Sequence, residues 1–274
     1  MKHSYLLPIL FLTASVAAGG CTRKHEAMDL SGIHTSAARE TMASSTVAAT
    51  SAAQETSPAS QDTAPGSPAN VSAVIETYKD DSKGSVSIQY PVVANLSDSQ
   101  TEEKVNELLL ANATAVADAV SDDGPVTLDI TCDVVSVDRN RLTAVYKGTC
   151  QTDGGAYPVN LFYTNTVDLK QAKSLGFNDY SDAYTMAGYV MSDDVRFFQA
   201  GSDLTKALLA HRASMSVEEY TALFESADFP LGTGGDAAFP ESFSYTHEGV
   251  LYFSIPVPHA LGDYAIVTFN MDGK

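Results

Sequence analysis

Apolar and polar positions begin to follow regular patterns after residue 72. In segment 84–91, GSVSIQYP, apolar residues alternate with polar ones, which predicts a strand that ends at its proline. Over residues 99–120, apolar side chains recur every three or four positions, so we expect a helix with one buried face. Ser99 and Glu102 have the spacing of a capping box at the start of this helix.

The rest of the chain carries more strand-like than helix-like patterns. Strands are expected at residues 126–137, 142–150, 157–167, 190–199, 249–257 and 263–271. Helices are expected around residues 204–209 and from Ser216, which forms a second capping box with Glu219. This order predicts an α+β fold with a mainly antiparallel sheet and packed helices.

The first residues have the features of a targeting signal. Residues 1–20 combine a basic start, an apolar run and small residues ahead of Cys21, as in a bacterial lipoprotein signal peptide. We therefore expect Cys21 to be lipidated and to anchor the chain; the alternative is an ordinary secretory signal with an incidental cysteine. The apolar run is shorter than the roughly 20 residues of a membrane span. Since Thr22 rather than Asp follows the cysteine, we expect the cell envelope, at the outer membrane facing the periplasm if the cell is Gram-negative.

A linker is expected between this anchor and the folded part. Of the 30 residues from 41 to 70, 19 are Ala, Ser or Thr, and prolines are interspersed. Such a composition buries too little apolar surface to offset the entropy lost on ordering, which predicts disorder over residues 21–72. Two α+β modules should follow, at residues 73–122 and 123–274, as one compact unit.

The chain is strongly acidic. From residue 71 onward it has 12 Lys and Arg against 29 Asp and Glu, a net charge of −17. A nucleic-acid partner is excluded, because no basic stripe is present to neutralise phosphates. The charge would attract a cationic partner, and the alternative is that it only maintains solubility.

Two cysteines remain if Cys21 carries lipid. Cys132 and Cys150 lie in neighbouring predicted strands, in an oxidising compartment where disulfides persist. We expect them to form a disulfide, which would close a loop of about 18 residues and contribute roughly 3 kcal/mol.

Three stretches resemble a known two-module extracytoplasmic domain of unknown function. Residues 87–120 are similar to its N-terminal module, and residues 142–167 and 243–269 are similar to its C-terminal module. The family carries Gly-Gly-Ala-His between two strands, and here Tyr157 stands in place of the histidine. This domain occurs in the lysozyme-binding ectodomain of an anti-sigma factor and ahead of the catalytic domain of a peptidoglycan deacetylase.

The resemblance implies binding at the envelope of a cationic, lysozyme-like protein or of peptidoglycan. The candidate ligand-binding residues surround the turn, namely Asp153, Gly154, Gly155 and Tyr157. No enzymatic activity, cofactor or metal is expected, because the histidines lack the spacing of metal ligands and no nucleophile motif occurs. Two alternatives stay open: a structural envelope lipoprotein without a ligand, and a hydrolase with an unrecognised site.

Overall fold

The computed structural model describes residues 70–120, 124–231 and 238–273. The signal peptide 1–20, the lipidation site Cys21 and nearly all of the linker lie outside the described residues. Within the described ranges, no helix has the length and hydrophobicity needed to cross a bilayer.

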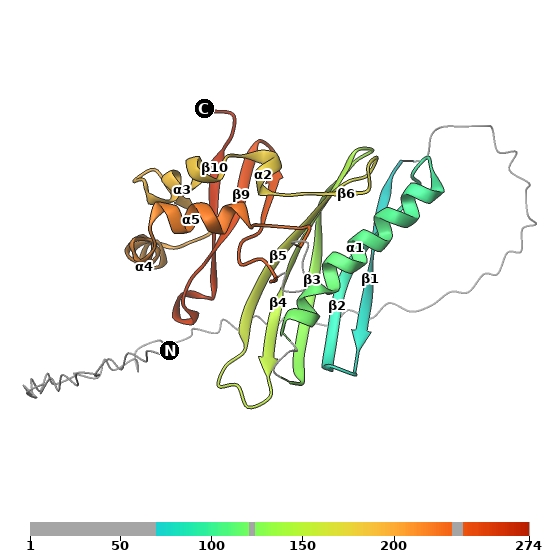
Figure 1. The fold of residues 1–274 in the computed structure, drawn as a ribbon, viewed down its shortest axis with the longest axis horizontal. Helices are drawn as coiled ribbons and strands as arrows, with labels where there is room; N and C mark the ends of the chain where they lie inside the picture. The colour runs from blue at the N-terminus through green and yellow to red at the C-terminus, as the bar shows by residue number, and fades with distance from the viewer. Residues whose placement is uncertain (1–69, 121–123, 232–237, 274) are drawn as a thin grey trace, which may run out of the picture. The chain divides into compact units, whose positions relative to one another are not determined.

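A six-stranded sheet, here called the large sheet, forms the first part of the fold (Figure 1). Its strands follow the chain order: β1 (Ser72–Asp80), β2 (Gly84–Ala94), β3 (Val126–Val137), β4 (Arg141–Thr152), β5 (Val159–Asp168) and β6 (Lys173–Leu175). All neighbours are antiparallel except β2 and β3, which are parallel because helix α1 (Ser99–Val120) connects them. The module boundary expected near residue 122 therefore falls between two paired strands.

Helix α1 packs on one face of the large sheet (Figure 1). Its bounds agree with the predicted helix, since its apolar residues recur on a single buried face. The predicted capping box at Ser99 is wrong by one residue. The carboxylate of Asp98 accepts the Thr101 N–H at 2.9 Å, and the Glu102 carboxylate accepts the Leu96 N–H at 2.9 Å. Asp98 therefore caps the helix.

A four-stranded antiparallel sheet, here called the small sheet, forms the second part. Its order is β7 (Arg196–Phe197), β10 (Tyr264–Asn270), β9 (Val250–Pro256) and β8 (Ser244–His247). The helices of this part are α2 (Phe177–Tyr180), α3 (Ala183–Met191), α4 (Ser202–His211), α5 (Val217–Glu225) and the short 3-10 turns η1 (Arg212–Ser214) and η2 (His259–Leu261). Their apolar side chains share a core with the small sheet.

Strand β5 carries contacts on both of its faces. On one face, the Tyr163 hydroxyl donates to the Ala113 carbonyl of α1 at 2.8 Å. On the other, the Thr164 hydroxyl donates to the Ser244 carbonyl of β8 at 2.6 Å. This double contact explains why residues 162–167 are buried and why the two sheets form one folded unit.

The α+β class with mainly antiparallel sheets is confirmed, whereas two strand predictions are wrong and some elements were not predicted. The strand expected at 190–199 is the end of α3 followed by the two-residue β7. Strand β2 continues through Pro91, which pairs with Ile75 of β1. Strand β1 itself was not predicted, because its side chains are mostly exposed and show no apolar alternation.

The expected disulfide between Cys132 and Cys150 is also wrong. Both cysteines are free and buried. The register of β3 and β4 pairs Cys132 with Tyr146, four residues from Cys150 on the same strand. Four residues span roughly 13 Å of strand, while bridged cysteines need Cα atoms within about 7 Å.

Candidate functional site

The hairpin that joins β4 to β5 contains all four candidate ligand-binding residues. Gly154 has φ +75°, a conformation that glycine adopts without strain. A side chain on Gly155 would place its Cβ 2.6 Å from the Thr152 hydroxyl. The Gln151 side chain donates to the Gly155 carbonyl at 2.8 Å and closes the turn. The two glycines thus shape the turn rather than contact a ligand through side chains.

Tyr157 is the most exposed large apolar or aromatic side chain of the described residues, with 69% of its surface accessible. Its ring nevertheless has a partner, since it stacks on His259 with centroids 5.4 Å apart and planes 22° apart. Val159, two positions along, is 45% exposed. The hairpin therefore presents an aromatic and an aliphatic side chain to solvent, with the aromatic ring held in place.

Asp263 fixes the position of His259. The Nδ1 of His259 lies 3.0 Å from one carboxylate oxygen of Asp263, while the Asn160 backbone N–H donates to the other oxygen at 2.8 Å. The Asn160 side chain adds a further bond of 2.9 Å. Burial alone would raise the pKa of Asp263, but the hydrogen bonds from Asn160 and His259 outweigh it and lower that pKa.

Four residues around the hairpin connect two distant parts of the chain. Tyr157 and Asn160 belong to the hairpin, whereas His259 and Asp263 flank the turn between β9 and β10. We call Tyr157, Asn160, His259 and Asp263 the hairpin cluster. Since the aspartate accepts the Nδ1 proton, the Nε2 of His259 has no partner imposed by this pair. The cluster can offer a ring face and an imidazole nitrogen to a ligand.

Asp153 lies on the same hairpin but outside this cluster. Its backbone N–H donates to the Pro125 carbonyl at 3.2 Å, and its side chain is exposed. Asp153 and Gly154 help to line an open depression with Gly84 of β2. The structure thus places all four predicted residues on one hairpin, with Asp153 at one side of the turn and Tyr157 against His259.

His259 and Asp263 were not among the predicted site residues. Their spacing of four residues within a turn could have suggested a pair, but pairing with the hairpin depends on the tertiary fold. Only the packing of the small sheet against β5 brings Asp263 to Asn160. That contact has no signal in the local sequence.

A second polar cluster is fully buried between the two sheets. Asp228, which is 4% exposed, accepts the Phe177 N–H at 2.7 Å, the Ser244 N–H at 2.6 Å and the Ser244 hydroxyl at 2.5 Å. Thr164 lies 3.3 Å from the same carboxyl group. Burial raises the pKa of Asp228 to about 7, although hydrogen bonds from Ser244 and Phe177 oppose the rise.

The geometry explains how a protonated Asp228 fits here. Thr164 has one hydroxyl proton, and it goes to the Ser244 carbonyl at 2.6 Å. A protonated Asp228 can donate to the Thr164 oxygen in return. Because the group is closed to solvent, we regard this cluster as the structural link between the sheets rather than a site for a ligand.

Among the described residues, no group of three or more His, Cys, Asp or Glu side chains is placed to hold a metal ion. In the hairpin cluster, the His259–Asp263 pair has no hydroxyl or thiol nucleophile hydrogen-bonded to it within these ranges.

Comparisons with known proteins give limited information. No family model and no curated protein matches the chain. A DUF3298 family protein from Bacteroides fragilis is 15% identical with a TM-score of 0.41, covering 74% of this chain and 90% of its own. A DUF3298 family protein from Pseudomonas aeruginosa is 12% identical with a TM-score of 0.33, with the same coverage of both chains.

Both neighbours are named only as DUF3298 family proteins. Neither connects this chain to an anti-sigma factor or to a deacetylase. Similarities this low do not transfer a function or a site residue.

Proposed function

We propose that this chain is an envelope-tethered, non-enzymatic binding protein whose contact surface is the β4–β5 hairpin with the His259 turn. The partner is a cationic protein of the lysozyme kind. Tyr157 carries the proposal, because it is 69% exposed and yet ordered by its stacking on His259. An aromatic side chain held in place at the surface loses little entropy on binding, which is typical of interface hot spots.

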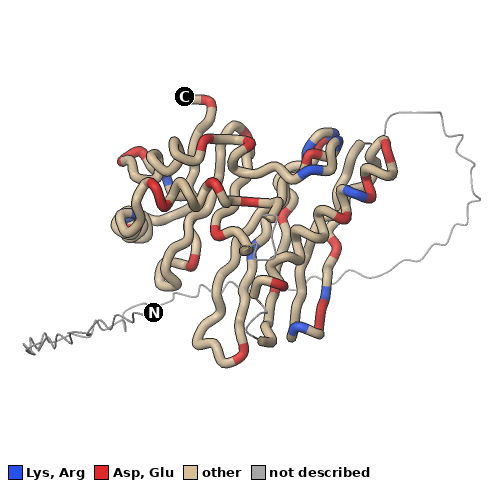
Figure 2. Tube along the Cα trace, viewed as in Figure 1, with Lys and Arg blue, Asp and Glu red and all other residues tan. Residues whose placement is uncertain are grey.

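The charge of the chain supports a cationic partner. The 274 residues carry 34 Asp and Glu against 16 Lys and Arg, a net charge of −18. Acidic residues are spread over most of the described chain (Figure 2). Such a field speeds the encounter with a cationic protein, while the ordered Tyr157 and the exposed Val159 supply apolar contact.

The anchor is a separate part of the proposal. It rests on the small residues before Cys21 and on the apolar run that precedes them. We expect a Cys21→Ser chain to lose incorporation of labelled fatty acid and to leave the membrane fraction. Fatty-acid labelling that persists in the serine variant would contradict lipidation at this cysteine.

Binding of hen-type lysozyme to the full chain tests the proposal. We expect binding that persists at about 150 mM salt, where surface charges more than a Debye length apart are screened. Tyr157→Ala should weaken it by about 2 kcal/mol or more, which is over tenfold. The matched control is Tyr184→Ala, which removes a tyrosine that is 65% exposed on α3 and should leave affinity unchanged.

Three other outcomes would lead to different conclusions. Binding that fades with salt and is equal in both tyrosine variants would mean nonspecific charge attraction. Binding of muropeptides rather than lysozyme, lost in Tyr157→Ala, would move the assignment to peptidoglycan, since an exposed ring can stack on a sugar. Binding of neither would favour a structural lipoprotein.

A further inference from the structure

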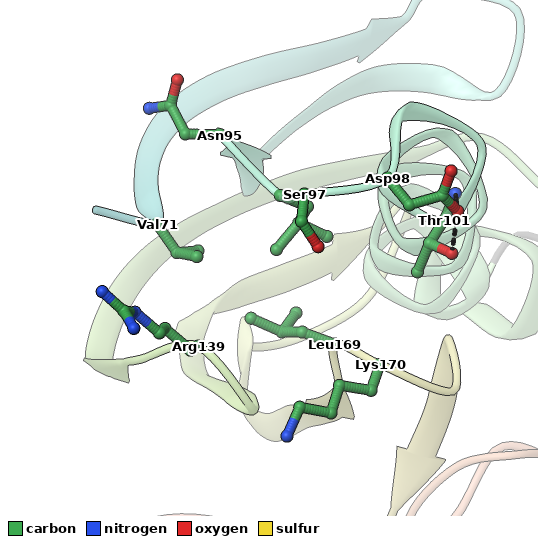
Figure 3. Close-up of a pocket in the computed structure, with 9 residues that line it drawn as sticks. Val71, Asn95, Ser97, Asp98, Thr101, Arg139, Leu169 and Lys170 are labelled. Atoms are coloured by element: carbon green, nitrogen blue, oxygen red, sulfur yellow. Dashed lines mark hydrogen bonds between the residues drawn. The ribbon is translucent and has the colours of Figure 1, made fainter. Parts of the chain in front are cut away.

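A cavity of about 750 Å³ lies at the end of the large sheet that is opposite to the β4–β5 hairpin. It is formed where the β3–β4 turn, the β5–β6 turn and the segment before α1 meet (Figure 3). Its volume is within the range of pockets that bind small molecules. Strand β4 runs from this end to the hairpin over 12 residues, roughly 40 Å, so the cavity is independent of the hairpin cluster.

Two cationic side chains line this cavity. Arg139 belongs to the β3–β4 turn and Lys170 to the β5–β6 turn, and both are exposed at the cavity (Figure 3). Neither forms an ion pair within the described residues. Two cations that line one cavity without forming an ion pair leave a local positive charge in a chain whose net charge is −18.

The turns explain why the nearest aspartates do not pair with these cations. Asp138 accepts the backbone N–H groups of Asn140 and Arg141 at 2.7 and 2.9 Å. In the same way, Asp168 accepts the backbone N–H groups of Lys170 and Gln171 at 2.8 and 2.9 Å. The backbone hydrogen bond from Asn140 is the largest cause of the lowered pKa of Asp138. The charge of Lys170 lowers the same pKa, but it is the smallest of the causes.

The opposite wall of the cavity consists of the residues that cap helix α1. One oxygen of the Asp98 carboxylate accepts two hydrogen bonds from Thr101, one from its backbone N–H and one from its hydroxyl. The helix start is thus satisfied by its own residue, and it does not supply the anion site. Of the described residues, Asp98 is the one acidic residue that lines the cavity, against the two cationic residues Arg139 and Lys170.

The cavity also has an apolar part. Leu169 is only 2% exposed, and its neighbours Leu96 and Val71 are half-buried around it. The Leu169 N–H donates to the Asn140 carbonyl at 2.7 Å, which joins the two turns and holds this wall in place. A ligand here would meet the apolar carbons of Leu169, with the Arg139 guanidinium on one side of this residue and the Lys170 ammonium on the other (Figure 3).

We propose that this cavity binds a small amphipathic carboxylate, with its oxygens on the Arg139 guanidinium and its apolar body against Leu96 and Leu169. The charge of Lys170 at the same cavity adds to the attraction for the anion. Arginine suits this chemistry because its planar fork can bind both oxygens of a carboxylate. The cavity is a second ligand site, and it goes beyond the protein-binding function proposed for the hairpin.

Hexanoate titrated into the full, ¹⁵N-labelled chain tests this site, with hexanol as the uncharged probe of equal chain length. We expect the backbone amide signals of Arg139, Leu169 and Lys170 to shift and saturate with hexanoate. Hexanol should bind at least about tenfold more weakly, because it offers no charge-assisted hydrogen bonds. The double variant Arg139→Gln/Lys170→Gln should lose that preference for the anion.

The matched control is Lys79→Gln/Lys206→Gln, which removes the same charge from exposed positions outside the cavity. It should retain the hexanoate shifts of the unmodified chain. Equal binding of hexanoate and hexanol, or equal hexanoate binding by both double variants, would overturn the proposal. Absence of saturable shifts at these three amides would overturn it too.

Discussion

Asp228 and Asp263 both connect strand β5 to the small sheet, but in opposite surroundings. Asp228 contacts Thr164 from the buried interior, and burial raises its pKa to about 7. Asp263 contacts Asn160 at the rim, where hydrogen bonds outweigh burial and lower its pKa. Both have positive φ values, 64° and 71°, which aspartate adopts more readily than most residues. Both residues are aspartates, so the residue type does not explain the difference. Access to water and the hydrogen-bond donors around each carboxyl decide whether the folded state favours the protonated or the ionised form.

The largest expected effect comes from removing the buried carboxyl. Asp228→Ala leaves the N–H groups of Phe177 and Ser244, and the Ser244 hydroxyl, without their acceptor. At about 1–3 kcal/mol for each unsatisfied buried group, we expect a loss of about 5 kcal/mol in the free energy of unfolding. Urea denaturation at neutral pH measures it. A loss below about 1 kcal/mol would contradict the role of Asp228 as the link between the sheets.

The next largest effect is on how the free energy of unfolding depends on pH. The sign of this dependence differs between the two aspartates. The folded state raises the pKa of Asp228 above its ordinary value of 3.8, so it favours the protonated form. The stability from this group is therefore full below about pH 4 and is lost as pH rises to about 7, a total of about 4 kcal/mol.

Asp263 has the opposite sign. Its pKa is lowered from 3.8, so its contribution is present at neutral pH and is lost as pH falls below that value.

Urea denaturation of the unmodified chain and of Asp228→Asn, between pH 4 and 8, tests the sign. The variant cannot ionise at this position, so its stability should fall less steeply with rising pH than that of the unmodified chain. Parallel curves would show that Asp228 does not titrate in this range. Asp263→Asn, the matched control, should keep the slope of the unmodified chain in the same range.

The smallest effect on stability is expected at the rim. Asp263→Ala removes the acceptor of Asn160 and His259, but water can replace it, so we expect a cost of about 1 kcal/mol. The larger consequence is local, because His259 no longer has a fixed orientation under Tyr157. Amide hydrogen exchange at residues 157–160 should accelerate, while exchange in α1 should not. Unchanged exchange at the hairpin would mean that Asp263 does not order it.

Local sequence patterns predicted the elements whose stability comes from one buried face. Helix α1 and the final strands are of this kind, because a single apolar stripe specifies both type and extent. The pattern failed for α3, whose sequence AYTMAGYVM is apolar over most of its surface and has no clear period. It also failed for β1, an edge strand with little to bury.

For the candidate site, the sequence predicts only those residues that lie close together along the chain. The hairpin follows from the Gly-Gly turn between two strands, and the family resemblance singles out Tyr157. His259 lies about a hundred residues further along the chain. The error about Cys132 and Cys150 has a similar cause, since a register of paired strands is a tertiary property. Asp228 is followed by Phe229 and Pro230 in a segment with no pattern, and only the packing of two sheets reveals its role.

In the proposed function, a cationic protein contacts the hairpin and the His259 turn. The most direct measurement is amide hydrogen exchange of the full chain with and without hen-type lysozyme, at about 150 mM salt. We predict protection in two separate stretches, residues 153–160 and 257–263, with no change around Tyr184. Protection elsewhere, or none at saturating lysozyme, would contradict the assignment of this surface.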